Sequence, residues 1–186
     1  MKRIAFAPVL AVLAASLAIA AAVAANLSGF WQTPTISGYG KMHDLPNAAY
    51  QPSKDAVYKI VFALTKSGTT PKDVNVSLDH VARAVNLYVA SGVPIDHLKF
   101  VAVAYGAATR LALDNAHYRA KFGVDNPNLP LIKELRKTGV NVTVCGQAVA
   151  EHHYEYGWIS PTVTVALSGL TTVTSLEQQG YALMPL

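Results

Sequence analysis

Cysteine is almost absent from this sequence, because its 186 residues contain only one, Cys145. A single cysteine excludes an internal disulfide, and it also excludes a zinc site built from several cysteines. The thiol of Cys145 is therefore buried, joined to another chain, or free to react.

Charged residues are also scarce, at 14% of the chain with a formal net charge of +4. Removal of Lys2 and Arg3 with an N-terminal leader would lower this charge to +2. So small a charge, without a basic cluster, does not indicate a nucleic-acid partner. The sequence also lacks a phosphate-binding loop, a nucleophile-elbow serine and a paired-carboxylate motif, and nothing in it indicates a cofactor.

The longest apolar run stands at the N-terminus. Met1-Lys2-Arg3 precede an uncharged segment rich in Ala, Leu, Val and Ile, which closes on Ala22-Val23-Ala24. This order is typical of a secretory signal peptide, expected here over residues 1–25. The run approaches the roughly 20 residues that span a bilayer, so an uncleaved anchor is the alternative. The alanine-rich composition and the A-x-A ending favour cleavage, which predicts a periplasmic protein without stable membrane association.

Residues 26–54, called the arm below, combine glycines and prolines with scattered aromatic side chains. This composition interrupts both helical and strand periodicity, so we expect an irregular N-terminal arm. Its aromatic side chains need apolar surroundings, and we expect them to cover the core or a neighbouring subunit. They are Phe30, Trp31, Tyr39 and Tyr50.

Residues 55–186 alternate strand-like and helix-like patterns without a repeat or linker. Continuous apolar or β-branched runs predict buried strands, and apolar residues at helical spacing predict amphipathic helices between them. This order implies right-handed parallel crossovers. We therefore predict a three-layer α/β sandwich with a mainly parallel sheet of about five strands and a flavodoxin/Rossmann-like topology. The expected strands are 57–65, 98–105, 140–144, 162–167 and 181–184, and the main expected helices are 77–90, 114–122, 126–138 and 170–179.

Cys145 follows directly on the third of these strands. The next residues favour a turn into a helix, and we expect the amides of Gly146 and Gln147 to stabilise a thiolate there. Ligands of open parallel sheets bind beyond the carboxyl ends of the strands, so Tyr105 and Gly106, at the end of the preceding strand, are expected in the same pocket. The alternative is that Cys145 is a small buried hydrophobic residue.

One local cluster has side chains that could bind a metal: His152, His153 and Glu155. On a helix, His152 and Glu155 share a face, but two ligands do not complete a first coordination shell. We therefore interpret this cluster as a solvated helix end and predict no metal. Two helical turns separate His152 from Cys145, about 10 Å, which is too far for direct activation of the thiol.

Five segments carry a resemblance: YKIVF (58–62), VNLYVASGV (85–93), NPNL (126–129), GVNVTVCGQA (139–148) and LEQQGYALM (176–184). Together they resemble the DsrE/DsrF-like family, and most closely its exported subgroup. The resemblance extends from about Tyr58 to Pro185, and it implies a parallel-sheet α/β domain that assembles into homo-oligomers. It also implies that Cys145 matches the cysteine that carries a persulfide in cytoplasmic sulfur-relay members. Many relatives have a histidine where this chain has Tyr105.

The leading hypothesis is an exported sulfur carrier or sulfurtransferase. Cys145 would accept a sulfane sulfur from a donor protein or a small sulfur compound and hand it to an acceptor. The alternative is a non-enzymatic, oligomeric periplasmic protein that binds a small ligand or a metal. In that case the thiol is inert, and the ligand or metal binds in the pocket near Gly106 or at the histidine cluster. A role purely in assembly or envelope stress is a third hypothesis.

Overall fold

The computed structural model describes residues 29–186 of the chain, so the predicted signal peptide lies outside the described residues. The chain divides into two compact units, Met1–Gln32 and Thr33–Leu186. In the described part of the first unit, the rings of Phe30 and Trp31 meet edge to face with their centroids 5.3 Å apart. Among residues 29–186, no helix has both the length and the apolar character needed to cross a membrane.

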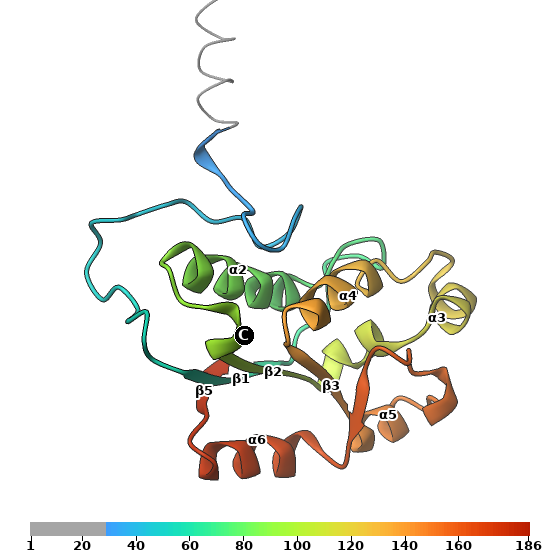
Figure 1. Ribbon diagram of the computed structural model, residues 1–186. Helices are drawn as coiled ribbons and strands as arrows, with labels where there is room; N and C mark the ends of the chain where they lie inside the picture. Colours follow the sequence, from blue (N-terminus) through green and yellow to red (C-terminus); the bar gives the residue numbers. More distant parts are fainter. Residues whose placement is uncertain (1–28) are drawn as a thin grey trace, which may run out of the picture. The chain divides into compact units, whose positions relative to one another are not determined.

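A five-stranded sheet forms the centre of the second unit (Figure 1). Its strands lie in the order β4-β3-β2-β1-β5, and each neighbouring pair is parallel. The predicted fold class, a three-layer α/β sandwich around a parallel sheet, is confirmed. The strands are β1 (Tyr58–Leu64), β2 (Leu98–Ala104), β3 (Asn141–Cys145), β4 (Thr164–Ala166) and β5 (Ala182–Pro185).

Helices cover both faces of the sheet, with α2 and α4 on one face and α5 and α6 on the other (Figure 1). The β1–β2 and β2–β3 connections carry α2 and α4 on one face, and the β4–β5 connection carries α6 on the other (Figure 1), since parallel strands need such crossover connections. The helices are α2 (Val76–Ala90), α3 (Asn115–Phe122), α4 (Leu129–Lys137), α5 (Gly146–Glu151) and α6 (Gly169–Gln178), and 3₁₀ helices form at Ile95–His97, Gly106–Ala112 and Tyr156–Trp158.

The two faces of the sheet are unequally buried. Because side chains alternate along a strand, Phe62, Phe100 and Val144 point to the face covered by α2 and α4, where the main core lies. On the other face, Val61, Val101 and Val103 form a smaller buried group against α6. Cys145 follows Val144 and therefore faces the side of α5 and α6.

Side-chain caps fix where two of the helices begin. The Asn75 side chain accepts a hydrogen bond from the Leu78 N–H at the start of α2, and Asp114 accepts one from the His117 N–H at the start of α3. These short polar residues are preferred at this position, because their side chains satisfy backbone donors that the helix leaves free.

Residues 33–54 of the arm form no helix or strand of their own, and several of their backbone groups bond to one buried side chain of α2, Asn86. The Asn86 amide oxygen accepts hydrogen bonds from the N–H groups of Thr35 and Ile36, and its amide nitrogen donates to the carbonyl oxygens of Tyr39 and Gly40. The arm backbone thus provides hydrogen-bond partners for both ends of the Asn86 amide, although the helical pattern alone would place this side chain on a polar surface.

Candidate functional site

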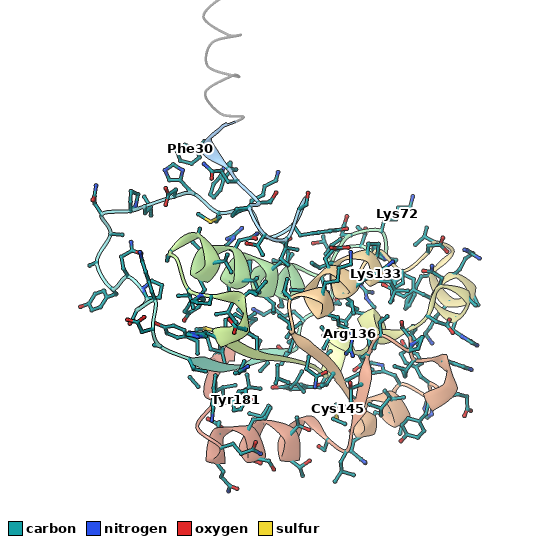
Figure 2. All side chains as sticks on the ribbon, viewed as in Figure 1. Phe30, Lys72, Lys133, Arg136, Cys145 and Tyr181 are labelled. Atoms are coloured by element: carbon teal, nitrogen blue, oxygen red, sulfur yellow. The ribbon has the colours of Figure 1, made fainter. Side chains whose placement is uncertain are left out.

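The register of β2 and β3 places Tyr105 beside Cys145. Ala104 is paired with Val144, so the next residue of each strand, Tyr105 and Cys145, lies at the same level at the carboxyl edge of the sheet. Figure 2 labels Cys145 at this position, where β3 gives way to α5. The sheet therefore brings together two residues that are 40 positions apart in the sequence.

The sulfur of Cys145 acts as the N-terminal cap of α5. The Ala148 N–H donates a hydrogen bond to Sγ with an N···S distance of 3.4 Å. This donor is the third residue of the helix, whereas the sequence analysis named the amides of Gly146 and Gln147. Cys145 is 6% exposed, so its contact with solvent is narrow.

Cys145 lines a pocket of about 540 Å³ between α5 and the start of α6. The volume is within the range of sites for small organic ligands. The walls are mostly apolar or hydroxyl-bearing, and Glu151 is the one charged side chain among them. The other lining residues are Tyr105, Gly106, Gln147, Ala148, Ser168, Gly169, Leu170, Val173 and Thr174.

Two glycines in this region allow close packing. A Cβ at Gly146 would lie 2.8 Å from the carbonyl oxygen of Ala166 in β4, so α5 can begin this near β4 only with glycine there. A Cβ at Gly169 would lie 3.1 Å from the ring of Tyr105. The first turn of α6 thus rests directly on Tyr105, and a side chain at Gly169 would displace that ring.

Gly106 forms the turn after β2. Its φ of 56° is in the left-handed region that glycine adopts readily, and its carbonyl oxygen is 2.8 Å from Nε2 of His152. His152 is therefore joined to the pocket wall through Gly106. Its ring also stacks on Tyr154, with the centroids 5.5 Å apart.

The cluster at the end of α5 lacks a third metal ligand. Nowhere in residues 29–186 do three or more His, Cys, Asp or Glu side chains come close enough to hold a metal ion. His153 is exposed at a left-handed turn, with φ 55°, and Glu155 precedes a 3₁₀ helix. Thus the structure does not bring His152, His153 and Glu155 together as ligands.

Burial raises the pKa of Tyr154, the residue on which His152 stacks, and the positive charge of Arg110 partly offsets this rise. Lys121 also lies over the Tyr154 ring, with Nζ 5.1 Å from the ring centroid. Tyr154 therefore remains a protonated aromatic support for His152 at neutral pH.

The sequence alone does not predict the contribution of α6 and of Glu151 to the pocket. Ser168, Gly169 and Leu170 are more than 20 residues from Cys145, and only the position of β4 beside β3 brings them to the same edge. A signal was nevertheless present, because Ser168 and Gly169 stand where a strand gives way to a helix, and that is the edge where parallel sheets bind ligands. The Ser168 side chain caps α6 by accepting from the Leu170 N–H.

Comparison with known structures supports the fold. The chain is similar to a protein of unknown function, MTH1491 from Methanobacterium thermoautotrophicum, with a TM-score of 0.51 and 16% identity. The similarity covers 69% of this chain and 99% of that protein. At this identity the likeness concerns the fold alone. None of the curated proteins matches this sequence.

Comparison with protein-family models identifies the family. The model of the DsrE/DsrF-like family matches residues 58–186, from the first residue of β1 through the whole sheet and the Cys145 pocket. The match covers more than half of the chain and includes the segments on which the resemblance was based. The chain therefore belongs to the DsrE/DsrF-like family.

Proposed function

We propose that this protein is a sulfur carrier or sulfurtransferase in which Cys145 accepts sulfane sulfur as a persulfide. A role in sulfur relay agrees with its family. The Cys145 thiolate attacks the outer sulfur of a donor R–S–SH, the S–S bond of the donor breaks, and a new S–S bond forms at Cys145. The thiolate R–S⁻ leaves and takes up the proton that the Cys145 thiol released, so no net oxidation occurs.

One observation carries this proposal: Sγ of Cys145 lies in a pocket wall and accepts a hydrogen bond from the Ala148 N–H. The nucleophile in sulfur exchange is the thiolate, and a backbone donor stabilises that form. The pocket provides room for the donor group R next to the sulfur. Family membership supplies an expectation of sulfur chemistry, whereas the assignment of the step to Cys145 is our inference.

Intact-mass spectrometry tests the proposal directly. The purified protein is treated with an organic persulfide, freed of excess reagent and weighed. A gain of about 32 Da that dithiothreitol removes, absent from Cys145→Ser, is the expected result. A second incubation with an acceptor thiol should return the mass to its starting value. Unchanged mass in the folded wild-type protein at all donor concentrations would contradict the proposal.

The low exposure of Cys145 favours one alternative, a binding protein with an inert thiol. In that case the pocket would hold a ligand without covalent chemistry, and the sulfur would only pack against its walls. The rate of alkylation by iodoacetamide separates these functions. In a sulfur carrier, the alkylation rate of Cys145 should be within a factor of about ten of the rate of a free thiol. In a binding protein with a sealed thiol, Cys145 should be alkylated only when the protein unfolds.

We also infer that the protein is exported and acts in the periplasm. The support is the sequence of residues 1–25, with its basic start, apolar middle and small-residue end. Donors and acceptors would then be periplasmic proteins or small sulfur compounds. The N-terminus of the protein isolated from the periplasm should begin close to Asn26, and an intact Met1 in that fraction would contradict cleavage.

Assembly into a homo-oligomer is the third part of the proposal. Leu167 and Leu170 are 72% and 82% exposed. Leu167 directly follows the short edge strand β4, and Leu170, in the first turn of α6, lines the Cys145 pocket. Neighbouring Val165 is 41% exposed. An apolar surface of this kind next to an open sheet edge is typical of an interface between subunits.

A further inference from the structure

A second pocket, here called the arm pocket, lies between the arm and the C-terminal half of α2. Its volume is about 560 Å³, and it shares no lining residue with the Cys145 pocket. The size suits a small organic ligand. Residues 42–52 of the arm form one wall, and Leu87 and Tyr88 of α2 contribute to the other.

The arm is fixed on both sides of this pocket. Before it, the Gly40 N–H donates to the Asp79 carboxylate at 2.8 Å. Within the wall, Met42 is buried and the Gln51 side chain accepts a hydrogen bond from Ser91. After it, the carbonyl oxygen of Ser53 accepts a hydrogen bond from the Tyr58 hydroxyl. The pocket is therefore framed by interactions with the domain and is not a chance gap under a free loop.

The arm does not fill the space that it encloses. Leu45 is 59% exposed, Tyr50 is fully exposed, and Leu87 on the opposite wall is 41% exposed. Tyr50 also has a φ of 58°, a left-handed conformation that is rare for a bulky residue and is found preferentially at ligand sites. Apolar surface left open inside a concave site is available to a ligand.

The charge of the arm pocket is negative. Asp44 is its only carboxylate, and no Lys or Arg lines it. Within residues 29–186 the Asp44 carboxylate forms no ion pair. Aromatic side chains complete the lining, since Tyr58 and Tyr88 pack with their ring centroids 4.5 Å apart. A carboxylate and tyrosine rings that line one pocket are groups that attract a cation, because the ring faces carry negative potential.

We propose that the arm pocket binds a small organic cation, an amine or quaternary ammonium compound with an apolar or aromatic body. The cationic group lies near Asp44 and the tyrosine rings, and the body covers Leu87 and Leu45. This site is independent of the Cys145 chemistry.

The Tyr88 hydroxyl gives the ligand a further polar contact. Within the described part of the chain it makes no hydrogen bond to another residue. Burial, together with the neighbouring Tyr58, raises the pKa of Tyr88, so its hydroxyl remains protonated at pH 8. A ligand that carries an acceptor can therefore bind better than one without it.

Calorimetric titration at pH 8 with three probes of similar body tests the inference: benzyltrimethylammonium, benzyl alcohol and phenylacetate. The cation should show saturable binding at least about fivefold tighter than either other probe. Asp44→Asn should weaken its binding about fivefold, as expected for a solvent-accessible ion pair.

The matched control is Glu177→Gln, which changes the net charge equally but lies on α6, outside the arm pocket. Glu177→Gln and Cys145→Ser should bind the cation as the wild type does. Thermal unfolding of each variant verifies that it is folded. Absence of saturable binding, equal affinity for the three probes, or equal affinity of wild type and Asp44→Asn would each overturn the inference.

Discussion

Nε2 of His152 is 2.8 Å from the carbonyl oxygen of Gly106, which joins the end of α5 to the turn that follows β2. Because a carbonyl oxygen can only accept, Nε2 carries the proton in this hydrogen bond. The nitrogen is therefore not available to take a proton from Cys145. The pair has a positioning role, since it holds the turn at Gly106 against the helix that Cys145 begins.

Replacement of His152 should affect stability more than thiol chemistry. We expect His152→Ala to lower the free energy of unfolding by about 1 kcal/mol, the usual value of one hydrogen bond. The alkylation rate of Cys145 should remain within about threefold of the wild type, whereas loss of a general base would reduce it about 100-fold or more. Urea denaturation and stopped-flow alkylation measure the two effects. His153→Asn, a change that tolerates the left-handed backbone at this position, is the control.

The charge of Glu151 should determine which reagents reach Cys145. Glu151 lies six residues after Cys145, about 9 Å along α5, and it is the only charged residue in the pocket lining. Uncharged 4,4′-dithiodipyridine should therefore react faster than dianionic 5,5′-dithiobis(2-nitrobenzoate), relative to the rates of a free thiol. Glu151→Lys should speed the dianionic reagent about fivefold and leave the neutral one nearly unchanged.

Glu177→Lys is the control for this experiment, because Glu177 is on α6 but does not line the pocket. If both lysine variants accelerate the dianionic reagent equally, the effect comes from net charge and not from the pocket. The same experiment indicates the donor class, since a pocket that repels anions favours uncharged organic sulfur donors over thiosulfate.

Removal of the Asn86 side chain should detach the arm. In Asn86→Ala, two backbone N–H groups and two carbonyl groups of the arm lose their partner, and some of them are buried. We expect a loss of about 3 kcal/mol in the free energy of unfolding, measured by urea denaturation. Ser91→Ala, which removes one long and exposed hydrogen bond to Gln51, should cost less than about 0.5 kcal/mol. Similar losses in the two variants would contradict this role of Asn86.

Asp114 should make stability depend on pH. Burial opposes its ionisation, but the backbone N–H and ring of His117 and the N–H of Ala116 outweigh burial and hold the pKa of Asp114 below its ordinary value. The ionised carboxylate therefore stabilises the fold fully at pH values above the ordinary carboxyl pKa. This stabilisation is lost as the pH falls through the lowered pKa.

Asp114→Asn keeps an oxygen that can cap α3 but removes the titration. The difference in unfolding free energy between wild type and Asp114→Asn should be constant near neutral pH and shrink in acid. Asp114→Ala should lose about 1 kcal/mol at neutral pH because it also lacks the cap. If the difference in unfolding free energy between wild type and Asp114→Asn did not change from pH 7 to pH 3, Asp114 would not be a source of the pH dependence.

The exposed leucines beside the Cys145 pocket should govern assembly. Leu170→Asp places a charge on a surface that is apolar over Leu167 and Leu170, and it should convert the proposed homo-oligomer to a monomer. Light scattering coupled to size-exclusion chromatography measures the mass. Leu45→Asp, at an arm leucine that is 59% exposed, should leave the mass unchanged. A monomeric wild type would contradict the proposal outright.

Much of the fold could be predicted because its signals are local. The apolar runs at β1 and β2, the helical spacing within α2 and the polar cap at Asn75 each act over a few residues. Parallel pairing then followed from the alternation of strands and helices. The end of β3 at Cys145 could likewise be predicted from the sequence, since the β-branched residues stop there and helix-forming residues follow.

Contacts between distant segments could not be predicted in this way. The amide that reaches Sγ is that of Ala148, because the geometry of the cap selects the third residue of the helix. Glu151 and Leu170 share a pocket with Cys145 only because β4 lies beside β3. The arm has no periodic pattern, so nothing local indicated that it would surround Asn86.

The sequence by itself determined the elements, their order and the single sulfur at the carboxyl end of a strand, because propensities and caps depend on near neighbours. The tertiary structure decided which side chains meet at that sulfur, that His152 bonds to Gly106, and that the arm encloses a second pocket against α2. These outcomes depend on strand order, register and the burial of polar groups, which are properties of the packed chain as a whole.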